Sequence, residues 1–247
     1  PEAIKKEHDL KIVFTPLHGT TYELVPESLR NWGFTNIYPV PEQSIPDGDF
    51  PTVASANPEE PAAFKMALDL ARKIDADLAM ACDPDGDRIG IAVKNDERIW
   101  TLLNGNQTNI IFTEYIIRRK KELGQLTGGE YTVKTIVTSE LIKDIAEKNN
   151  IICYDVYTGF KWIADVIRKE GGEKFIGGGE ESFGYMPGAF TRDKDGVSAT
   201  SLMAEIAAWT KMQNKTLYSF LKEIYAKYGF SQEKMIYIVR KGITGAQ

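Results

Sequence analysis

The stretch DLAMACDPDGDRIGIAV, residues 77–93, places an acidic turn between two apolar runs. Residues 77–82 and 88–93 predict β-strands, since each run is short, apolar and bounded by turn-forming or charged residues. Residues 98–102 are a further strand-like run, which predicts a hairpin with the second of these strands. A strand that ends in a polar turn is typical of α/β proteins, which bind ligands at the carboxyl edge of the sheet. The stretch therefore indicates an α/β fold with a functional site at this turn.

The turn carries three carboxylates at alternate positions, separated by Pro84 and Gly86. Alternating carboxylates in a constrained turn can converge on one hard cation, and without a cation their charges repel one another. Arg88 follows directly and could hold a phosphate through paired hydrogen bonds. The predicted metal ligands are Asp83, Asp85 and Asp87.

Two other patterns of closely spaced aspartates differ from this turn. An EF-hand loop needs glycine at its sixth position and glutamate at its twelfth, where this chain has Arg88 and Lys94, so an EF-hand is excluded. Phosphatases of the haloacid dehalogenase type also have Asp-x-Asp after a strand, but they want threonine or valine where this chain has Asp87. That class remains an alternative. A solvated acidic turn is another, although three acids and an arginine within six residues make it a costly one.

Strand and helix signals alternate along the rest of the chain, which predicts α/β layers. Further strands are predicted at residues 11–15, 37–40, 133–138, 151–156, 174–177 and 235–239. Helices are predicted at residues 22–32, 57–74, 110–124, 139–148, 159–169, 197–212 and 217–228. Asn57, Pro58 and two glutamates mark the start of the second of these helices, since they suit a helix N-terminus. A boundary near Asn104 gives two domains of ordinary size, residues 1–104 and 105–247.

Composition restricts the class of protein. Hydrophobic residues are 43% and charged residues 26% of the 247 residues, which is the balance of a soluble globular protein. The net charge of −5 argues against nucleic-acid binding, which needs clustered lysine and arginine. A membrane partner is not expected, because no apolar run approaches the roughly 20 residues of a membrane span and no signal peptide is recognisable. Cys82 and Cys153 lack CxxC spacing and are expected to be free thiols in a cytoplasmic protein.

A glycine-rich stretch predicts a second binding loop. Residues 177–185 read GGGEESFGY and follow directly on a predicted strand. Glycine lets a backbone approach a ligand closely, and alternating carboxylate and hydroxyl side chains suit neighbouring sugar hydroxyls. TGFK at residues 158–161 and TRDKDG at residues 191–196 also precede predicted helices, and the latter brings two bases to a helix N-terminus, a favourable place for phosphate. By itself the glycine-rich stretch is equally consistent with a tight turn whose acids face water, and stretches like the other two are more often surface charge clusters.

Together these stretches resemble the α-D-phosphohexomutases, and most of all their phosphoglucomutase/phosphomannomutase branch. Four motifs occur in the family's order and at its separations, namely DPDGDR (83–88), TGFK (158–161), GEESFG (179–184) and RDKDG (192–196). TPLHGT at residues 15–20 is similar to the start of the family's second domain. The resemblance covers nearly the whole chain. It implies the middle domains II and III of the family, each a three-layer α/β/α domain with a mixed sheet.

The resemblance also implies a role for each site residue. The three aspartates would hold Mg²⁺, which in the family also contacts a phosphoserine, and Arg88 would lie at the reacting phosphate. Glu180 and Ser182 would bind sugar hydroxyls, and Lys194 would transfer a proton or stabilise charge. The sister branch has Gly-His where this chain has residues 183–184, so the preference for glucose or mannose phosphate is not readable. Further substrate contacts are implied at Thr158, Lys161 and Arg192.

Two parts of the enzyme that the resemblance implies are missing from this chain. The family moves phosphate between C1 and C6 of glucose or mannose phosphate through a phosphoserine of its first domain, with glucose 1,6-bisphosphate as primer. Ser55 lies in a similar stretch, but alanine follows it where the family has histidine, so we do not expect it to be the nucleophile. The Arg-x-Ser-Gly-Thr of the C-terminal phosphate-binding domain is also lacking. The chain is expected to be a mutase fragment, inactive alone; a non-catalytic magnesium- and phosphosugar-binding module is the alternative.

Overall fold

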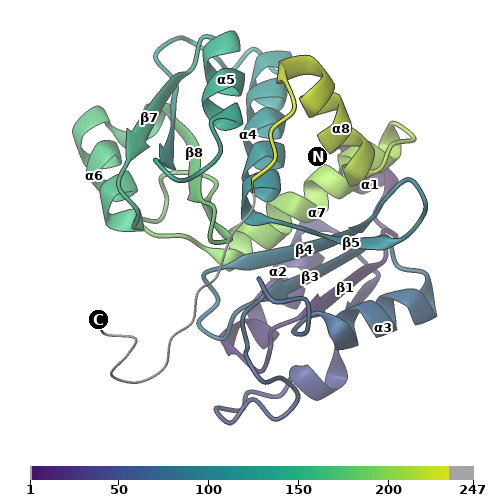
Figure 1. Ribbon diagram of the computed structural model, residues 1–247. Helices are drawn as coiled ribbons and strands as arrows, with labels where there is room; N and C mark the ends of the chain where they lie inside the picture. The colour runs from purple at the N-terminus through teal and green to yellow at the C-terminus, as the bar shows by residue number, and fades with distance from the viewer. Residues whose placement is uncertain (1, 234–247) are drawn as a thin grey trace.

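The computed structural model describes residues 2–233 and contains two mixed β-sheets flanked by helices (Figure 1). In the first sheet the strand order is β2-β1-β3-β4-β5. The strands β2, β1 and β3 are parallel, whereas β4 and β5 are each antiparallel to the preceding strand. The bounds are β1 (Ile12–Thr15), β2 (Ile37–Pro39), β3 (Leu78–Cys82), β4 (Ile89–Lys94) and β5 (Trp100–Leu103).

The second sheet has the strand order β7-β6-β8-β9. Here β7, β6 and β8 are parallel, and β9 returns antiparallel to β8. The strand predicted at residues 235–239 lies outside the described residues. The bounds are β6 (Tyr131–Thr135), β7 (Ile152–Val156), β8 (Phe175–Glu180) and β9 (Gly184–Met186).

Helices cover both faces of each sheet, so each sheet is the middle of three layers (Figure 1). The predicted α/β fold with two α/β/α units and mixed sheets is confirmed. The α-helices are α1 (Glu2–Lys6), α2 (Leu24–Trp32), α3 (Lys65–Ile74), α4 (Gly105–Glu122), α5 (Leu141–Lys148), α6 (Phe160–Glu170), α7 (Gly196–Met212) and α8 (Leu217–Tyr228). Short 3₁₀ turns occur at Thr20–Tyr22, Pro41–Gln43 and Gly172–Lys174.

The central strand β3 is apolar throughout because both of its faces are covered. Ala79 and Ala81 belong to the core beneath α3, whereas Leu78 and Met80 belong to the core beneath α1, α2 and α7. Successive side chains of a strand point to opposite faces, so this division follows from the strand geometry. The acidic turn that follows β3 is thereby fixed at the edge of a buried strand.

Helix α7 joins the two halves of the chain. It follows the second sheet in sequence but packs against α1 and α2 and lies on β3 and β4 (Figure 1). Eleven of its residues are buried, which is typical of a helix enclosed on more than one side. Its apolar side chains belong to one continuous core that also includes α4 and α8. The two sheets therefore share a core, and the start of α7 lies between them.

The helix predicted at residues 57–74 starts later than expected, at Lys65. Residues 57–64 form successive turns in which an amide bonds to the carbonyl three residues earlier, as Glu60 does to Asn57 and Phe64 to Pro61. An α-helix from Asn57 would need the residue four positions on to donate an amide hydrogen, and Pro61 has none. The helix start was therefore predicted wrongly, although the apolar face of the remaining helix is buried as expected.

The glycines predicted to form a loop instead lie within β8, and the additional strand β9 follows. Gly178 pairs with Met186 and Gly179 with Tyr185. A Cβ on Gly179 would lie 1.8 Å from Asn109 Oδ1 of α4, so this strand needs glycine because a helix packs closely on it. The loop is consequently shorter than predicted and consists of residues 181–183.

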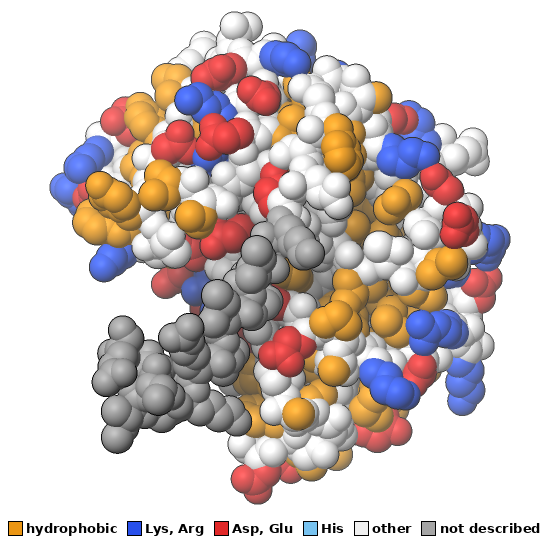
Figure 2. Space-filling view, viewed as in Figure 1, with side chains coloured by type: hydrophobic (Ala, Val, Ile, Leu, Met, Phe, Trp, Pro, Cys, Tyr) orange, Lys and Arg blue, Asp and Glu red, His pale blue; other side chains and the backbone are white. Residues whose placement is uncertain are grey.

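The described surface mixes charged and apolar groups. On the face shown in Figure 2, basic, acidic and apolar side chains are interspersed. Several opposite charges pair within helices, such as Lys65 with Asp69 at 2.7 Å and Lys169 with Asp165 at 2.6 Å. Among the helices of residues 2–233, none has the length and apolarity that crossing a membrane requires.

Glu130 closes the turn that leads into β6. Its carboxylate accepts hydrogen bonds from the amides of Thr127 (2.7 Å) and Gly128 (2.9 Å) and from the Thr127 hydroxyl (3.1 Å). Lys174 adds a positive charge at 3.4 Å. Burial opposes ionisation, but the hydrogen bonds outweigh it and lower the pKa of Glu130 to about 2.

We expect Glu130→Gln to lower the free energy of unfolding near neutral pH by about 1–2 kcal/mol, since charged hydrogen bonds become neutral ones. The folded-state pKa lies below the unfolded value of about 4.3, so the stabilisation is complete above that pH and is lost as the pH falls toward 2. Urea unfolding near neutral pH and at about pH 3 measures this. A difference between wild type and variant that is equal at both pH values would contradict the assignment.

Candidate functional site

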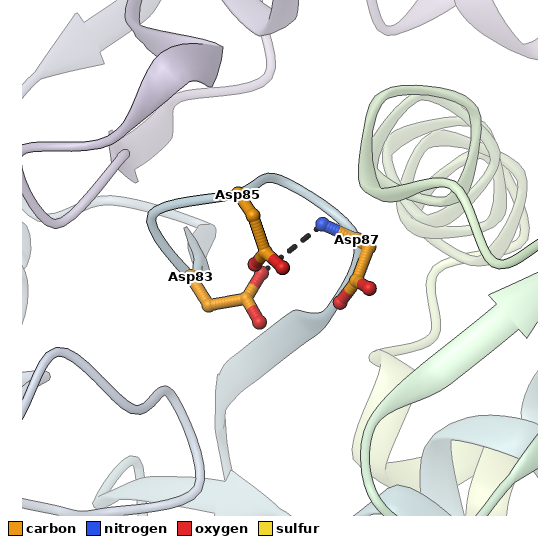
Figure 3. A group of neighbouring side chains, drawn as sticks. All are labelled: Asp83, Asp85 and Asp87. Atoms are coloured by element: carbon orange, nitrogen blue, oxygen red, sulfur yellow. Dashed lines mark hydrogen bonds between the residues drawn. The ribbon is translucent and has the colours of Figure 1, made fainter. Parts of the chain in front are cut away.

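The three predicted metal ligands converge in the turn between β3 and β4. One carboxylate oxygen from each of Asp83, Asp85 and Asp87 lies within 4.8 Å of the other two (Figure 3). Asp83 Oδ1 also accepts hydrogen bonds from the amides of Asp87 (3.1 Å) and Arg88 (2.9 Å), which holds the turn closed. Asp83 is buried and Asp85 is exposed, so the group opens to solvent on one side.

The electrostatics of this group favour a cation. Burial, together with the charges of Asp87 and Asp85, raises the pKa of Asp83 to about 7, against the opposing hydrogen bond from the Arg88 amide. A divalent cation among the three carboxylates would offset this repulsion. Oxygen ligands from three carboxylates, with one open side for water, fit Mg²⁺.

Two backbone contacts clamp the acidic turn. On one side the Thr20 amide donates to the Pro84 carbonyl (2.8 Å), and a Cβ on Gly19 would lie only 2.2 Å from Pro84 Cα. On the other side the Gly196 amide, at the start of α7, donates to the Gly86 carbonyl (3.0 Å). A Cβ on Gly196 would lie 2.5 Å from the same carbonyl oxygen. The turn is thus held between the TPLHGT segment and the RDKDG segment.

Arg88 is fixed by acidic residues on two sides. Its Nη1 donates to Glu59 Oε1 (3.0 Å), and its Nε lies 3.5 Å from Asp83 Oδ2 and 3.9 Å from Asp87 Oδ1. The Glu59 side chain is only 8% exposed. Sequence reasoning missed Glu59 as a site residue, because it was interpreted as part of a helix start. No local pattern indicated this role, because its partner Arg88 lies 29 residues further along the chain.

Lys194 connects the acidic turn to the second sheet. Its Nζ forms an ion pair with Asp87 Oδ2 at 2.6 Å and lies 5.5 Å from the ring centre of Phe160. A Cβ on Gly184 would lie 2.6 Å from the Lys194 side chain, so glycine makes room for it. Burial lowers the pKa of Lys194, but the hydrogen bond to Asp87 and the surrounding carboxylates together raise it above its ordinary value.

Glu180 ends β8 and is 5% exposed. Its Oε1 accepts a hydrogen bond from the Gly159 amide at 2.5 Å, which ties it to the TGFK segment. Burial raises the pKa of Glu180, and the adjacent Glu181 raises it further, against the Gly159 hydrogen bond and the charge of Lys194. This carboxylate can accept hydrogen bonds from hydroxyl groups.

The acidic turn and the turn at residues 181–183 lie side by side. The Ile89 amide donates to the Phe183 carbonyl (3.0 Å), and Arg88 pairs with Gly184 as an isolated β-bridge. Together with the Lys194–Asp87 pair, these contacts bring the predicted metal, phosphate and sugar residues to one place.

The remaining predicted residues are less tightly connected. Ser182 is half-buried in the turn after β8, and Thr158 is exposed next to Gly159. Lys161 is exposed, with its Nζ 5.3 Å from the Trp162 ring centre. Arg192 is exposed and donates to backbone carbonyls of its own loop. Their proposed substrate contacts remain predictions.

Two protein-family models match most of the chain. The model of phosphoglucomutase/phosphomannomutase α/β/α domain II matches residues 2–97, and the model of domain III matches residues 104–228. The chain therefore belongs to the phosphoglucomutase/phosphomannomutase family. This membership leaves the haloacid dehalogenase alternative without support.

Curated relatives and solved structures agree with this family membership. The chain is 38% identical over 238 residues to the phosphoglucomutase of Staphylococcus aureus strain MRSA252, covering 96% of this chain and 42% of that protein. A Thermus thermophilus protein described as a phosphomannomutase superposes with a TM-score of 0.74 at 22% identity, covering 93% of this chain and 50% of that one. A Burkholderia thailandensis phosphoglucomutase/phosphomannomutase family protein gives 0.70 at 18% identity, covering 90% and 45%. The chain thus spans less than half the length of the curated relatives it matches.

The clamp predicts that Gly19→Ala is destabilising. The new Cβ would collide with the Pro84 backbone, whereas the φ of Gly19, −95°, costs alanine nothing. Overpacking of this kind lowers the free energy of unfolding by about 1–3 kcal/mol. Gly48→Ala is the matched control, because nothing lies within 4 Å of its Cβ position. Equal unfolding midpoints for the two variants in urea would show that the clamp is not tight.

Proposed function

We propose that this chain is the middle part of a magnesium-dependent phosphohexomutase, an isomerase of carbohydrate metabolism. The parent enzyme would move phosphate between C1 and C6 of glucose or mannose phosphate. The observation that carries the proposal is the 2.6 Å contact between Lys194 and Asp87, because it joins the acidic turn to the elements that hold Glu180. The two domains of this chain would be residues 1–104 and 105–247. The free thiols of Cys82 and Cys153 would suit the cytoplasm.

Each residue of the site has a proposed task. Asp83, Asp85 and Asp87 would hold Mg²⁺, which supplies positive charge to stabilise a phosphoryl group during transfer. Arg88, oriented by Glu59, keeps further N–H groups that can donate to phosphate oxygens.

Substrate contacts would come from the second half of the chain. Glu180 accepts hydrogen bonds from sugar hydroxyls, with Ser182 beside it, and Lys194 donates to phosphate or hydroxyl oxygens. Lys194 is held protonated by its carboxylate neighbours, so it acts first as a proton donor and charge stabiliser. Thr158, Lys161 and Arg192 are proposed as outer substrate contacts.

Phosphoryl transfer between two positions of a sugar needs a group that carries the phosphate. Ser55 is a poor candidate in this chain, since its hydroxyl donates to Glu60 Oε1 at 2.8 Å and alanine follows it where the family has histidine. We propose that the carrier is a phosphoserine in a preceding domain and that a following domain binds the distal phosphate. The 42% coverage of the curated relatives is consistent with two such further parts. Glucose 1,6-bisphosphate would serve as primer.

Magnesium binding tests the metal site. We expect calorimetry to detect Mg²⁺ binding to this chain and Asp85→Asn to weaken it by about tenfold or more, because one of three charged ligands is lost. Asp144→Asn is the matched control, since Asp144 is exposed on α5 outside the acidic turn. Equal affinities for wild type and Asp85→Asn would remove the turn as the site.

Turnover and binding test the rest of the proposal. With glucose 1-phosphate and glucose 1,6-bisphosphate, the isolated chain is expected to form no glucose 6-phosphate yet to bind hexose phosphate weakly. Glu180→Gln should weaken that binding by about tenfold, because a charged hydrogen bond becomes neutral. Turnover that disappears in Ser55→Ala would identify Ser55 as the carrier. If the protein encoded by the full reading frame binds hexose phosphate but shows no turnover, the non-catalytic binding module is favoured instead.

A further inference from the structure

The turn that follows Glu180 contains a second carboxylate with a different set of partners. Glu181 Oε2 lies 3.1 Å from the hydroxyls of Thr135 and Thr138, and both hydroxyls can donate to it. The two hydroxyls are also 2.7 Å apart. Two hydroxyl protons serve these three contacts, so when both stay among them the Glu181 carboxylate accepts at least one. Glu181 is thereby tied to the end of β6.

A buried lysine contacts the backbone of both threonines. Lys134, whose side chain is 1% exposed, forms ion pairs with Asp155 (2.6 Å) and Glu140 (2.8 Å). Its Nζ also lies 3.2 Å from the Thr138 carbonyl and 3.4 Å from the Thr135 carbonyl. A buried ammonium is costly unless all its protons are used, so these contacts fix the turn at residues 135–138.

Other contacts hold the backbone of residues 180–183 from the opposite side. Asn109 Nδ2 donates to the Glu180 carbonyl (2.9 Å), and a Cβ on Gly105 would lie 1.8 Å from the Glu181 carbonyl oxygen. Phe183 is buried with a φ of +65°, an unfavourable conformation for a residue with a Cβ. This turn is strained and needs anchors to keep one conformation.

We infer that Glu181 is a positioning residue that anchors the turn through Thr135 and Thr138, so that Glu180 and Ser182 are presented to a hexose phosphate. The negative charge of Glu181 next to the buried Glu180 is electrostatically unfavourable. The hydrogen bonds from the two threonine hydroxyls explain why a carboxylate is nevertheless found at this position. The role in substrate binding rests on the proposed function, whereas the anchoring itself does not.

Hydrogen exchange tests the anchor without a ligand. The Ile89 amide, bonded to Phe183, and the Gly159 amide, bonded to Glu180, report on the turn. In Glu181→Leu we expect both to exchange about tenfold faster, since hydrogen bonds to a carboxylate are lost. Glu181→Gln keeps an acceptor oxygen but replaces charged hydrogen bonds by neutral ones, so its exchange rates should lie between those of wild type and Glu181→Leu. The amide of Ala76, at the end of α3, should not change in either variant.

Two further variants complete the exchange experiment. Thr135→Val combined with Thr138→Val removes both donors and should reproduce Glu181→Leu, while the exposed Glu147→Gln should behave as wild type. If the double valine variant does not fold, the exchange rates of Glu181→Leu and Glu181→Gln still test whether Glu181 anchors the turn. Exchange at Ile89 and Gly159 that is unchanged in Glu181→Leu would overturn the anchor.

Binding of glucose 6-phosphate tests the consequence for substrate. The dissociation constant is expected to rise about tenfold in Glu181→Leu and to recover partly in Glu181→Gln, with Mg²⁺ affinity unchanged in both. A purely structural role would instead speed exchange at Ala76 as well and weaken Mg²⁺ binding. If wild type binds no glucose 6-phosphate, the proposed function fails while the exchange result still stands. Faster exchange with unchanged affinity would overturn the role in presenting Glu180.

Discussion

The close approach of two backbones, at Gly86 and Gly196, is the constraint on which the site depends. The Gly196 amide bonds to the Gly86 carbonyl at 3.0 Å, and neither position has room for a side chain. Because α7 begins at Gly196 and is buried in a core shared by both sheets, this contact fixes the acidic turn relative to the second sheet. Lys194, two residues earlier, can then reach Asp87.

Charge is distributed unevenly across the site. Among the described residues of the site, Asp83, Asp85, Asp87 and Glu180 outnumber the two bases, Arg88 and Lys194, and each base is already paired with a carboxylate. Of these carboxylates Asp83 and Glu180 are buried and Asp87 is half-buried, so the excess of negative charge is costly unless a cation reduces it. The same pairs hold the two bases in place, which under the proposed function would lower the entropy lost when a phosphate binds.

Below the site, polar groups replace apolar ones at the end of β6. Lys134 and Thr135 occupy the last two positions of β6, where a strand between two helical layers would ordinarily carry apolar side chains, and Thr138 lies in the turn that follows. Each of these groups is hydrogen-bonded, so the burial is compensated. Together these groups provide fixed hydrogen-bond partners for the short turn after β8, whose three residues, 181–183, are too few to fix their own conformation.

Local patterns in the sequence were sufficient for the α/β fold, for most strands and helices and for the aspartate triad, because alternating carboxylates and short apolar runs act over a few residues. Patterns of this range misplaced the start of α3, where Pro61 removes a donor, and took the glycines of β8 for a loop. The partnership of Arg88 with Glu59, 29 residues apart, and that of Glu181 with Thr135, 46 residues apart, were decided by tertiary structure alone. Such contacts join segments that only the packed sheets and α7 bring together, so no local spacing encodes them.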